Sequence, residues 1–202
     1  MKQIFKQTQL YNFLKYCEDN ELDNIVLDCG AGGDQPPLYL FYRQGYETYG
    51  IDIDEEQIRK ANDFERNNDL NLNISEGDMR KLPFEDNSIS YVYSYNSIFH
   101  MVKKDIYTSL KEMKRVLKVD GLLYVNLLSN DDFQYGVGRE LEEGEFLQEE
   151  CGGRVVHSYF REDEADKHFE DMKVLFKQLR TSERYFGDEK VKQGYIDYIC
   201  RK

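Results

Sequence analysis

Regular alternation between short apolar strands and amphipathic helices is the feature that most restricts the fold of this chain. Strands are predicted over residues 24–30, 45–54, 72–76, 89–95 and 122–128. Helical spacing of apolar residues predicts helices over residues 4–18, 34–43, 54–67 and 106–117. Such alternation predicts a parallel sheet with helices on both faces.

The alternation stops after Ser129. Residues 130–158 are rich in Gly and Glu without clear periodicity, and a polar helix is expected over 161–175. Two further strands, near 179–186 and 194–200, are joined by a link too short for a helical crossover, so we expect an antiparallel pair at a sheet edge. The prediction is an α/β, doubly wound, Rossmann-like sheet of seven strands, mostly parallel, with a C-terminal antiparallel hairpin.

Length and charge limit the function classes. The 202 residues predict a single domain over 1–202, with 130–158 as a substrate-side loop or lid. The balance of 27 basic against 39 acidic residues gives a net charge of -12, which argues against nucleic acid and anionic membranes as partners. With three histidines and four scattered cysteines, no zinc or disulfide framework is expected. The sequence shows no signal peptide and no apolar run long enough to span a membrane, so we expect a cytoplasmic protein with reduced thiols.

A glycine loop follows the first predicted strand. The segment VLDCGAGG (26–33) lets the backbone turn sharply and lets a ligand approach closely, and Asp52 ends the next strand at the spacing typical of a ribose-binding carboxylate. A dinucleotide fits poorly, because Gln35 occupies a position that is normally small and because Asp28 and Asp34 would repel phosphates. An adenosine ligand that carries a cation, such as S-adenosylmethionine, suits this acidic loop better.

At these residues the sequence resembles the small class I S-adenosylmethionine-dependent methyltransferases, of the domain 11 or 25 type. The resemblance covers residues 25–128 through four motifs in order: VLDCGAGG, GIDID, EGDMRKLPFEDNSISYVYS and MKRVLKVDGLLYVN. It departs from the family where a third alternate glycine is replaced by Asp34. It implies methyl transfer from S-adenosylmethionine, with S-adenosylhomocysteine as the product.

The resemblance also implies the roles of particular residues toward this cofactor. Gly30 and Gly32 would line its methionine portion, which Asp28 would help to orient, and Asp52 would hold the ribose diol. Asp78 would accept from the adenine amino group, while Met79 and Ile53 would cover the two sides of the base. Tyr95 would offer its backbone carbonyl to the ammonium, and Tyr11 would cap the carboxylate.

Two histidines are candidates on the acceptor side. His100 follows the fourth predicted strand, where substrate enters such folds, and is the candidate general base for a hydroxyl or ammonium acceptor. A histidine satisfied within the fold is the alternative. His157 is a candidate substrate contact, and the acidic run 140–150 is interpreted as a solvated face, although Glu140 or Glu142 are candidates to meet a cationic substrate.

The acceptor itself is expected to be a small molecule. The sequence does not support DNA base methylation. Nucleic-acid N-methyltransferases clamp the amino group of the base with an Asp-Pro-Pro-Tyr signature after the fourth strand, and residues 94–97 at that position are SYNS. Two rival functions stay open: a non-catalytic sensor that binds S-adenosylmethionine, and an NAD-dependent oxidoreductase of the same topology. The oligomeric state is not predicted.

Overall fold

The computed structural model describes residues 8–150 and 152–202. The helices are α1 (Thr8–Glu18), α2 (Leu38–Arg43), α3 (Glu55–Asn68) and α4 (Lys103–Val116), with a 3-10 turn η1 (Asp166–His168). The strands are β1 (Ile25–Cys29), β2 (Glu47–Asp52), β3 (Ile74–Glu76), β4 (Ile89–Ser94), β5 (Leu117–Ser129), β6 (Arg139–Glu142), β7 (Glu145–Glu150), β8 (Gly153–Phe160), β9 (Lys173–Phe186) and β10 (Glu189–Arg201).

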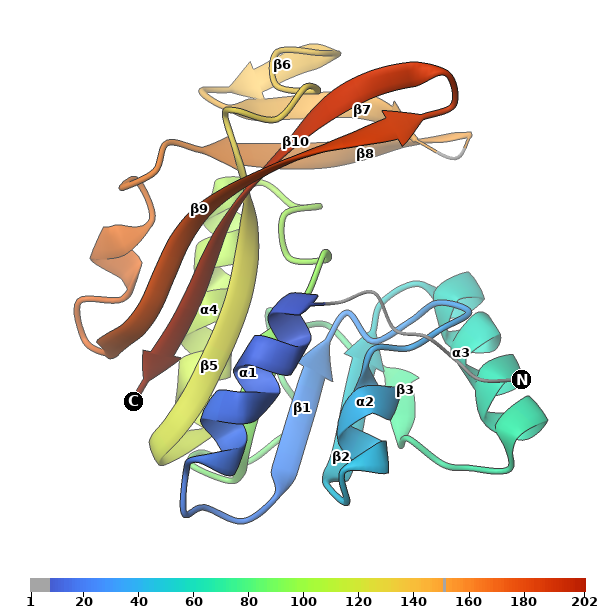
Figure 1. Cartoon of the computed structure of the whole chain (residues 1–202), viewed down its shortest axis with the longest axis vertical. Coiled ribbons are helices and arrows are strands. Elements are labelled where there is room, and N and C mark those ends of the chain that lie inside the picture. The colour runs from blue at the N-terminus through green and yellow to red at the C-terminus, as the bar shows by residue number, and fades with distance from the viewer. Residues whose placement is uncertain (1–7, 151) are drawn as a thin grey trace.

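The centre of the molecule is a sheet in the order β3-β2-β1-β4-β5, with all neighbours parallel. β10 pairs antiparallel with β5, and β9 pairs antiparallel with β10 at the edge, as Figure 1 shows. The doubly wound α/β fold with a C-terminal antiparallel hairpin is therefore confirmed. The predicted count of seven strands is too low, because the described residues form ten.

Helices cover both faces of this sheet. α4 packs its apolar stripe of Ile106, Leu110 and Met113 into one core, and α1 and α2 pack into a second core on the other face. Every residue of β4 is buried, as expected of a central strand covered on both sides. Asp54 caps α3, because its carboxylate accepts hydrogen bonds from the backbone N–H groups of Glu56 and Gln57.

Residues 130–158, expected to be a long connection without clear periodicity, contain regular strands. This stretch forms β6, β7 and most of β8, joined as successive antiparallel pairs. Positive φ angles at Gly144 and Gly152 place these glycines at the turns between the strands. The sequence signal was weak because acidic residues fill β6 and β7, where strand formation depends on tertiary pairing more than on intrinsic preference.

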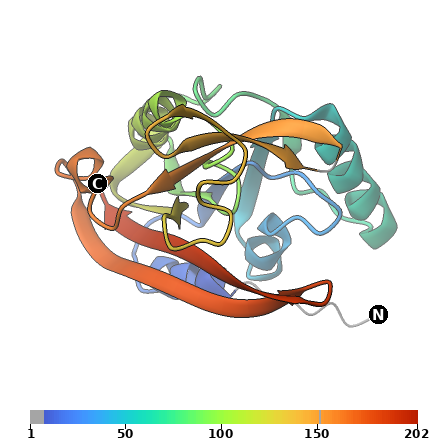
Figure 2. The same cartoon turned by 90° about the horizontal axis from the view of Figure 1, so that it is seen from above.

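The β6–β8 sheet lies over the carboxyl ends of the parallel strands. Leu128 of β5 pairs with Tyr195 of β10 and also with Tyr159 of β8, so these two strands occupy opposite edges of β5. β4 pairs with one edge of β5 as far as Val125, and β8 pairs with the same edge of β5 further along, at Leu128 and Ser129. Figure 2 shows the resulting sheet spread across this end of the molecule, which is the side where a lid was expected.

The helix predicted over 161–175 is also wrong. Residues 161–172 form turns with the single 3-10 turn η1, and β9 begins at Lys173. The extended conformation is imposed by β10, because thirteen residues of β9 between Lys173 and Phe186 pair with it, with one register shift between Ile199 and Cys200. Non-local ladder bonds override the local helical pattern here.

Several other predictions concern the ends of the chain and the thiols. The first predicted helix starts at Thr8 within the described residues, and its predicted member Ile4 lies outside them. Cys17, Cys29 and Cys200 are buried free thiols, whereas Cys151 lies outside the described residues. Across residues 8–150 and 152–202, the helices are all too short or too polar to cross a membrane.

Candidate functional site

The glycine loop after β1 is fixed by backbone hydrogen bonds to the neighbouring strand. The N–H groups of Gly30 and Ala31 both donate to the carbonyl of Ile51, at 2.8 and 2.9 Å. Gly30 has a φ of +99°, and a Cβ there would overlap the side chain of Ser97. The loop thus requires glycine at this position, both for its conformation and for the close approach of the chain segment after β4.

Asp52 joins the end of β2 to this loop. Its Oδ2 accepts a 2.9 Å hydrogen bond from the N–H of Gly32, and its Oδ1 accepts one of 3.0 Å from the N–H of Asp54. Asp54, not Asp52, caps the following helix. The Asp52 carboxylate is therefore oriented by two backbone donors and retains acceptor capacity on both oxygens.

Asp28 lies at the carboxyl end of β1 and is only 1% exposed. Neither of its carboxylate oxygens has a hydrogen-bond partner of good geometry among the described residues. Burial raises the pKa of Asp28 to about 8, an effect that the nearby Tyr93 hydroxyl opposes and the Asp52 charge reinforces. The glycine loop thus begins beside a buried carboxyl group, and no cationic side chain in the described part of the chain stabilises the charged form of that group.

The loop after β3 carries a charged triad. The Arg80 guanidinium donates to both oxygens of Asp78, at 2.7 to 3.0 Å, and to Asp105 of α4 at 2.8 Å. These hydrogen bonds lower the pKa of Asp78 below its usual value. The ion pairs hold Asp78, and the adjacent Met79, in a defined position relative to α4.

These loops enclose a cavity of about 950 Å³, a size typical of sites for drug-sized ligands. Six carboxylates and two cationic side chains line it, so it favours a cationic ligand. The carboxylates belong to Asp34, Asp52, Asp54, Glu56, Asp78 and Glu150, and the cations to Lys60 and Arg80.

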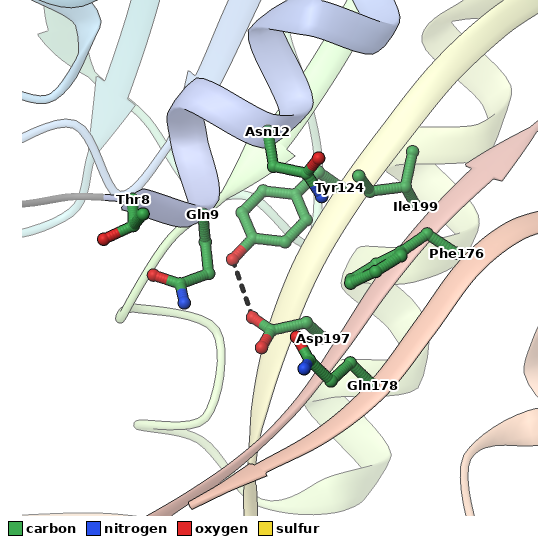
Figure 3. Close-up of a pocket in the computed structure, with 8 residues that line it drawn as sticks. All are labelled: Thr8, Gln9, Asn12, Tyr124, Phe176, Gln178, Asp197 and Ile199. Atoms are coloured by element: carbon green, nitrogen blue, oxygen red, sulfur yellow. Dashed lines mark hydrogen bonds between the residues drawn. The ribbon is translucent and has the colours of Figure 1, made fainter. Parts of the chain in front are cut away.

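A second pocket, of about 170 Å³, lies between α1 and the β9–β10 hairpin (Figure 3). Its polar centre is Asp197, which accepts a 2.8 Å hydrogen bond from the Tyr124 hydroxyl and pairs with Arg180 at 2.9 Å. This volume is below the range typical of nucleoside-sized ligands, so the larger cavity is the candidate functional site.

Most of the residues singled out from the sequence line the larger cavity. They are Gly30, Gly32, Asp52, Ile53, Asp78, Met79, Tyr95 and His100. Ile53 offers an apolar side chain that is 63% exposed, and the Tyr95 ring stacks against Tyr124 at 6.3 Å between centroids.

Five predicted residues are not among those that line the cavity: Tyr11, Asp28, His157 and the two candidate acidic residues Glu140 and Glu142. Tyr11 lies on α1 and is 45% exposed, and Asp28 is buried behind the glycine loop. His157 of β8 is 6% exposed and packs at right angles against His100, with 4.8 Å between ring centroids. His157 thus reaches the cavity wall through His100 and Glu150, both of which line it.

The two histidines are held as neutral imidazoles. Burial and the neighbouring His157 lower the pKa of His100 to about 4. Burial also lowers the pKa of His157, although Glu150 and Asp132 act in the opposite direction. Both rings therefore have a free nitrogen lone pair at neutral pH.

Sequence reasoning missed several residues of the cavity wall. Gln57 and Lys60 face it from α3, and their helical spacing from Asp54 was an available signal. Glu150 and Val155 come from β7 and the start of β8. Their position was not predictable, because the strands that carry them were not.

Comparison with known proteins identifies similar sequences and a similar fold. Residues 27–125 match the model of a methyltransferase domain. Sterol 24-C-methyltransferase ERG6B of Gibberella zeae is 30% identical over 118 residues, which cover 54% of this chain and 30% of that protein. Methyltransferase GfsG of Streptomyces halstedii is 30% identical over 119 residues, which cover 58% of this chain and 41% of that protein. The chain thus spans less than half the length of these relatives.

The fold has a counterpart along its whole length. A solved structure from Methanosarcina mazei, described as a SAM-dependent methyltransferase, superposes with a TM-score of 0.74. It is 23% identical in sequence, and the match covers 100% of this chain and 99% of that one. The hairpin and the strands above the parallel sheet therefore belong to a fold that exists in another protein.

Proposed function

We propose that this chain, whose residues 27–125 match a methyltransferase domain, transfers the methyl group of S-adenosylmethionine to a small-molecule acceptor. The observation that carries the proposal is the convergence of the glycine loop and Asp52, through the Gly32–Asp52 hydrogen bond, on one wall of the large cavity. The similarity to a sterol methyltransferase and the size of the cavity favour a small acceptor.

The residues present fit this cofactor. The glycines leave no side chain between the loop backbone and the cavity, and six carboxylates line the cavity against two cationic side chains. A ligand with positively charged ammonium and sulfonium groups would be attracted to this acidic wall, and Asp28, buried behind the loop, would add to the negative charge there when ionised. An acidic wall of this kind disfavours the two phosphates of NAD, which weakens the oxidoreductase alternative.

Specific roles follow from these positions. Asp52 would accept hydrogen bonds from the ribose diol with the acceptor capacity that its two backbone donors leave free. Gly30 and Gly32 would contact the methionine portion, and the Tyr95 carbonyl would accept from the ammonium. Met79 and Ile53 would cover the adenine, whose amino group would donate to Asp78.

Bound S-adenosylmethionine supplies a methyl group on a positively charged sulfur, which is already activated for in-line displacement. The protein therefore has to exclude water and hold the acceptor in line with the methyl carbon. The β6–β8 sheet would exclude water from above, and His100 would contact the acceptor, because it faces the cavity from the segment after β4. We propose that His100 accepts the acceptor's proton where the acceptor is a hydroxyl or an ammonium group.

The test is transfer of an isotopically labelled methyl group from S-adenosylmethionine to an extract of small metabolites, followed by mass spectrometry of the products. The parent protein should label a compound, and Asp52→Ala should lose this activity by at least about tenfold, since a charge-assisted hydrogen bond contributes about 1.5 to 3 kcal/mol. Asp23→Ala is the matched control, because the Asp23 side chain forms an exposed ion pair with Lys118 and does not line the cavity. Cofactor binding without any labelled product would favour the sensor alternative.

A further inference from the structure

Three side chains from different parts of the chain meet at the acceptor side of the cavity. His100 follows β4, Glu150 ends β7 and His157 lies in β8. One ligand atom of each lies within 4.8 Å of the others. The topology of β8 produces this meeting, because it continues along the edge of β5 that β4 leaves free and so passes above the segment that carries His100.

The spacing of these atoms is close to that of a metal site. Nε2 of His157 lies 3.4 Å from Oε2 of Glu150. Two ligands that bind one Zn²⁺ tetrahedrally, each at about 2.0 to 2.1 Å, are about 3.3 Å apart. The pair already has this separation, and the separations that involve His100 are at most 4.8 Å, so binding of one ion by all three residues requires side-chain rotation.

The burial of His157 also fits a metal site. His157 is only 6% exposed and packs against His100, so its Nε2 is held at the cavity wall beside Glu150. A ligand residue that is already held in place loses little conformational freedom when it binds an ion.

We propose that His100, His157 and Glu150 bind one divalent transition-metal ion, with Zn²⁺ as the best-matched ion. Two imidazoles and one carboxylate are a donor set that suits this ion and leaves an open coordination position. Since His100 and Glu150 line the cavity, the open position faces the space in which the acceptor would lie.

This site narrows the acceptor class, an inference that rests on the proposed function. An oxygen or nitrogen atom of the acceptor would fill the open coordination position of the ion. This favours small molecules with a hydroxyl, phenol or similar metal-binding group as acceptors. The ion would also take the His100 lone pair, so orientation of the acceptor by the metal would replace proton acceptance by His100.

The test is titration of the chelator-treated full chain with Zn²⁺ by calorimetry, and with Co²⁺ by visible absorption. We expect one ion per chain and Co²⁺ bands of a low-coordinate site. Glu150→Gln and His100→Ala should each weaken binding at least about tenfold, because loss of even an outer-shell partner costs about 10- to 100-fold. Glu149→Gln is the matched control, as Glu149 is the neighbouring exposed acid in β7 and does not line the cavity.

The outcomes separate this inference from the proposed function. Binding of S-adenosylhomocysteine without binding of Zn²⁺, or equal Zn²⁺ affinity in the parent and Glu150→Gln, would overturn the metal site and leave the methyltransferase proposal intact. Zn²⁺ binding that depends on Glu150 but not on Glu149, in a chain that does not bind S-adenosylhomocysteine, would support the metal site and overturn the methyltransferase proposal.

Discussion

The backbone N–H of Gly32 donates a 2.9 Å hydrogen bond to Oδ2 of Asp52, and this bond ties the glycine loop after β1 to the end of β2. Parallel pairing brings the two strand ends together, with Cys29 opposite Ile51. The carboxylate is thus oriented before any ligand arrives, which reduces the entropy lost on binding.

Gly32→Ala should weaken S-adenosylhomocysteine binding by at least about fivefold. An added Cβ would lie 2.7 Å from Oδ2 of Asp52 and would overlap Gln57, and overpacking of this kind typically costs about 1 to 3 kcal/mol. Calorimetry measures the affinity. Gly45→Ala is the control, since its φ of +82° adds backbone strain but its Cβ would meet no atom within 4 Å. Equal loss of affinity in both variants would contradict the steric explanation.

Replacing Asp28 by Asn should flatten the pH dependence of stability. The pKa of Asp28 is about 8 in the folded chain, against 3.8 for an ordinary aspartate, so between these values the unfolded chain has lost a proton that the folded chain retains. Stability contributed by Asp28 therefore falls as pH rises from about 4 to 8.

Urea unfolding at a series of pH values measures this effect as the difference between the parent protein and Asp28→Asn. The variant should gain stability relative to the parent as pH rises, which separates Asp28 from groups that both proteins share. A difference that is constant over this range would show that Asp28 ionises normally.

Arg80→Met should weaken cofactor binding while changing overall stability little. Arg80 orients Asp78 through several hydrogen bonds, but both side chains are about one-third exposed, so solvent screens their contribution to folding. We expect an affinity loss of about tenfold and a stability change below about 1 kcal/mol.

Arg66→Met is the control for this change. Arg66 forms an exposed ion pair with Asp63 in α3, and neither residue lines the cavity. Its removal should leave the calorimetric affinity unaltered. A large drop in the melting temperature of Arg80→Met would indicate that Arg80 acts mainly on folding.

Asp197→Ala should destabilise the protein by about 3 kcal/mol, because it leaves Arg180 without its buried partner and the Tyr124 hydroxyl without its acceptor. Chemical denaturation measures the free energy of unfolding. Asp131→Ala, which removes an exposed pair with Lys192, should change that free energy by less than about 1 kcal/mol. Similar values for the two variants would mean that burial of Asp197 matters little.

The parallel part of the fold was predictable because its signals are local. Each buried strand is a short apolar run, and the positions of Gly30 and Asp52 follow from where β1 and β2 end. Asp54 likewise predicts the start of the helix that it caps. For these elements local preference and tertiary structure agree.

The remainder was not predictable because it depends on distant pairing. The acidic strands β6 and β7 form only as partners of β8, and β9 replaces a helical pattern by pairing with β10. The grouping of His100 with His157 is a consequence of the same topology, since 57 residues separate them and only the path of β8 brings them together.

A crystal structure of the protein with S-adenosylhomocysteine tests the central claim most directly. We predict that the ligand occupies the large cavity, with its ribose hydroxyls within hydrogen-bond distance of the Asp52 carboxylate and its amino acid portion along Gly30 and Gly32. A ligand bound elsewhere, or a ribose that makes no contact with Asp52, would contradict the account.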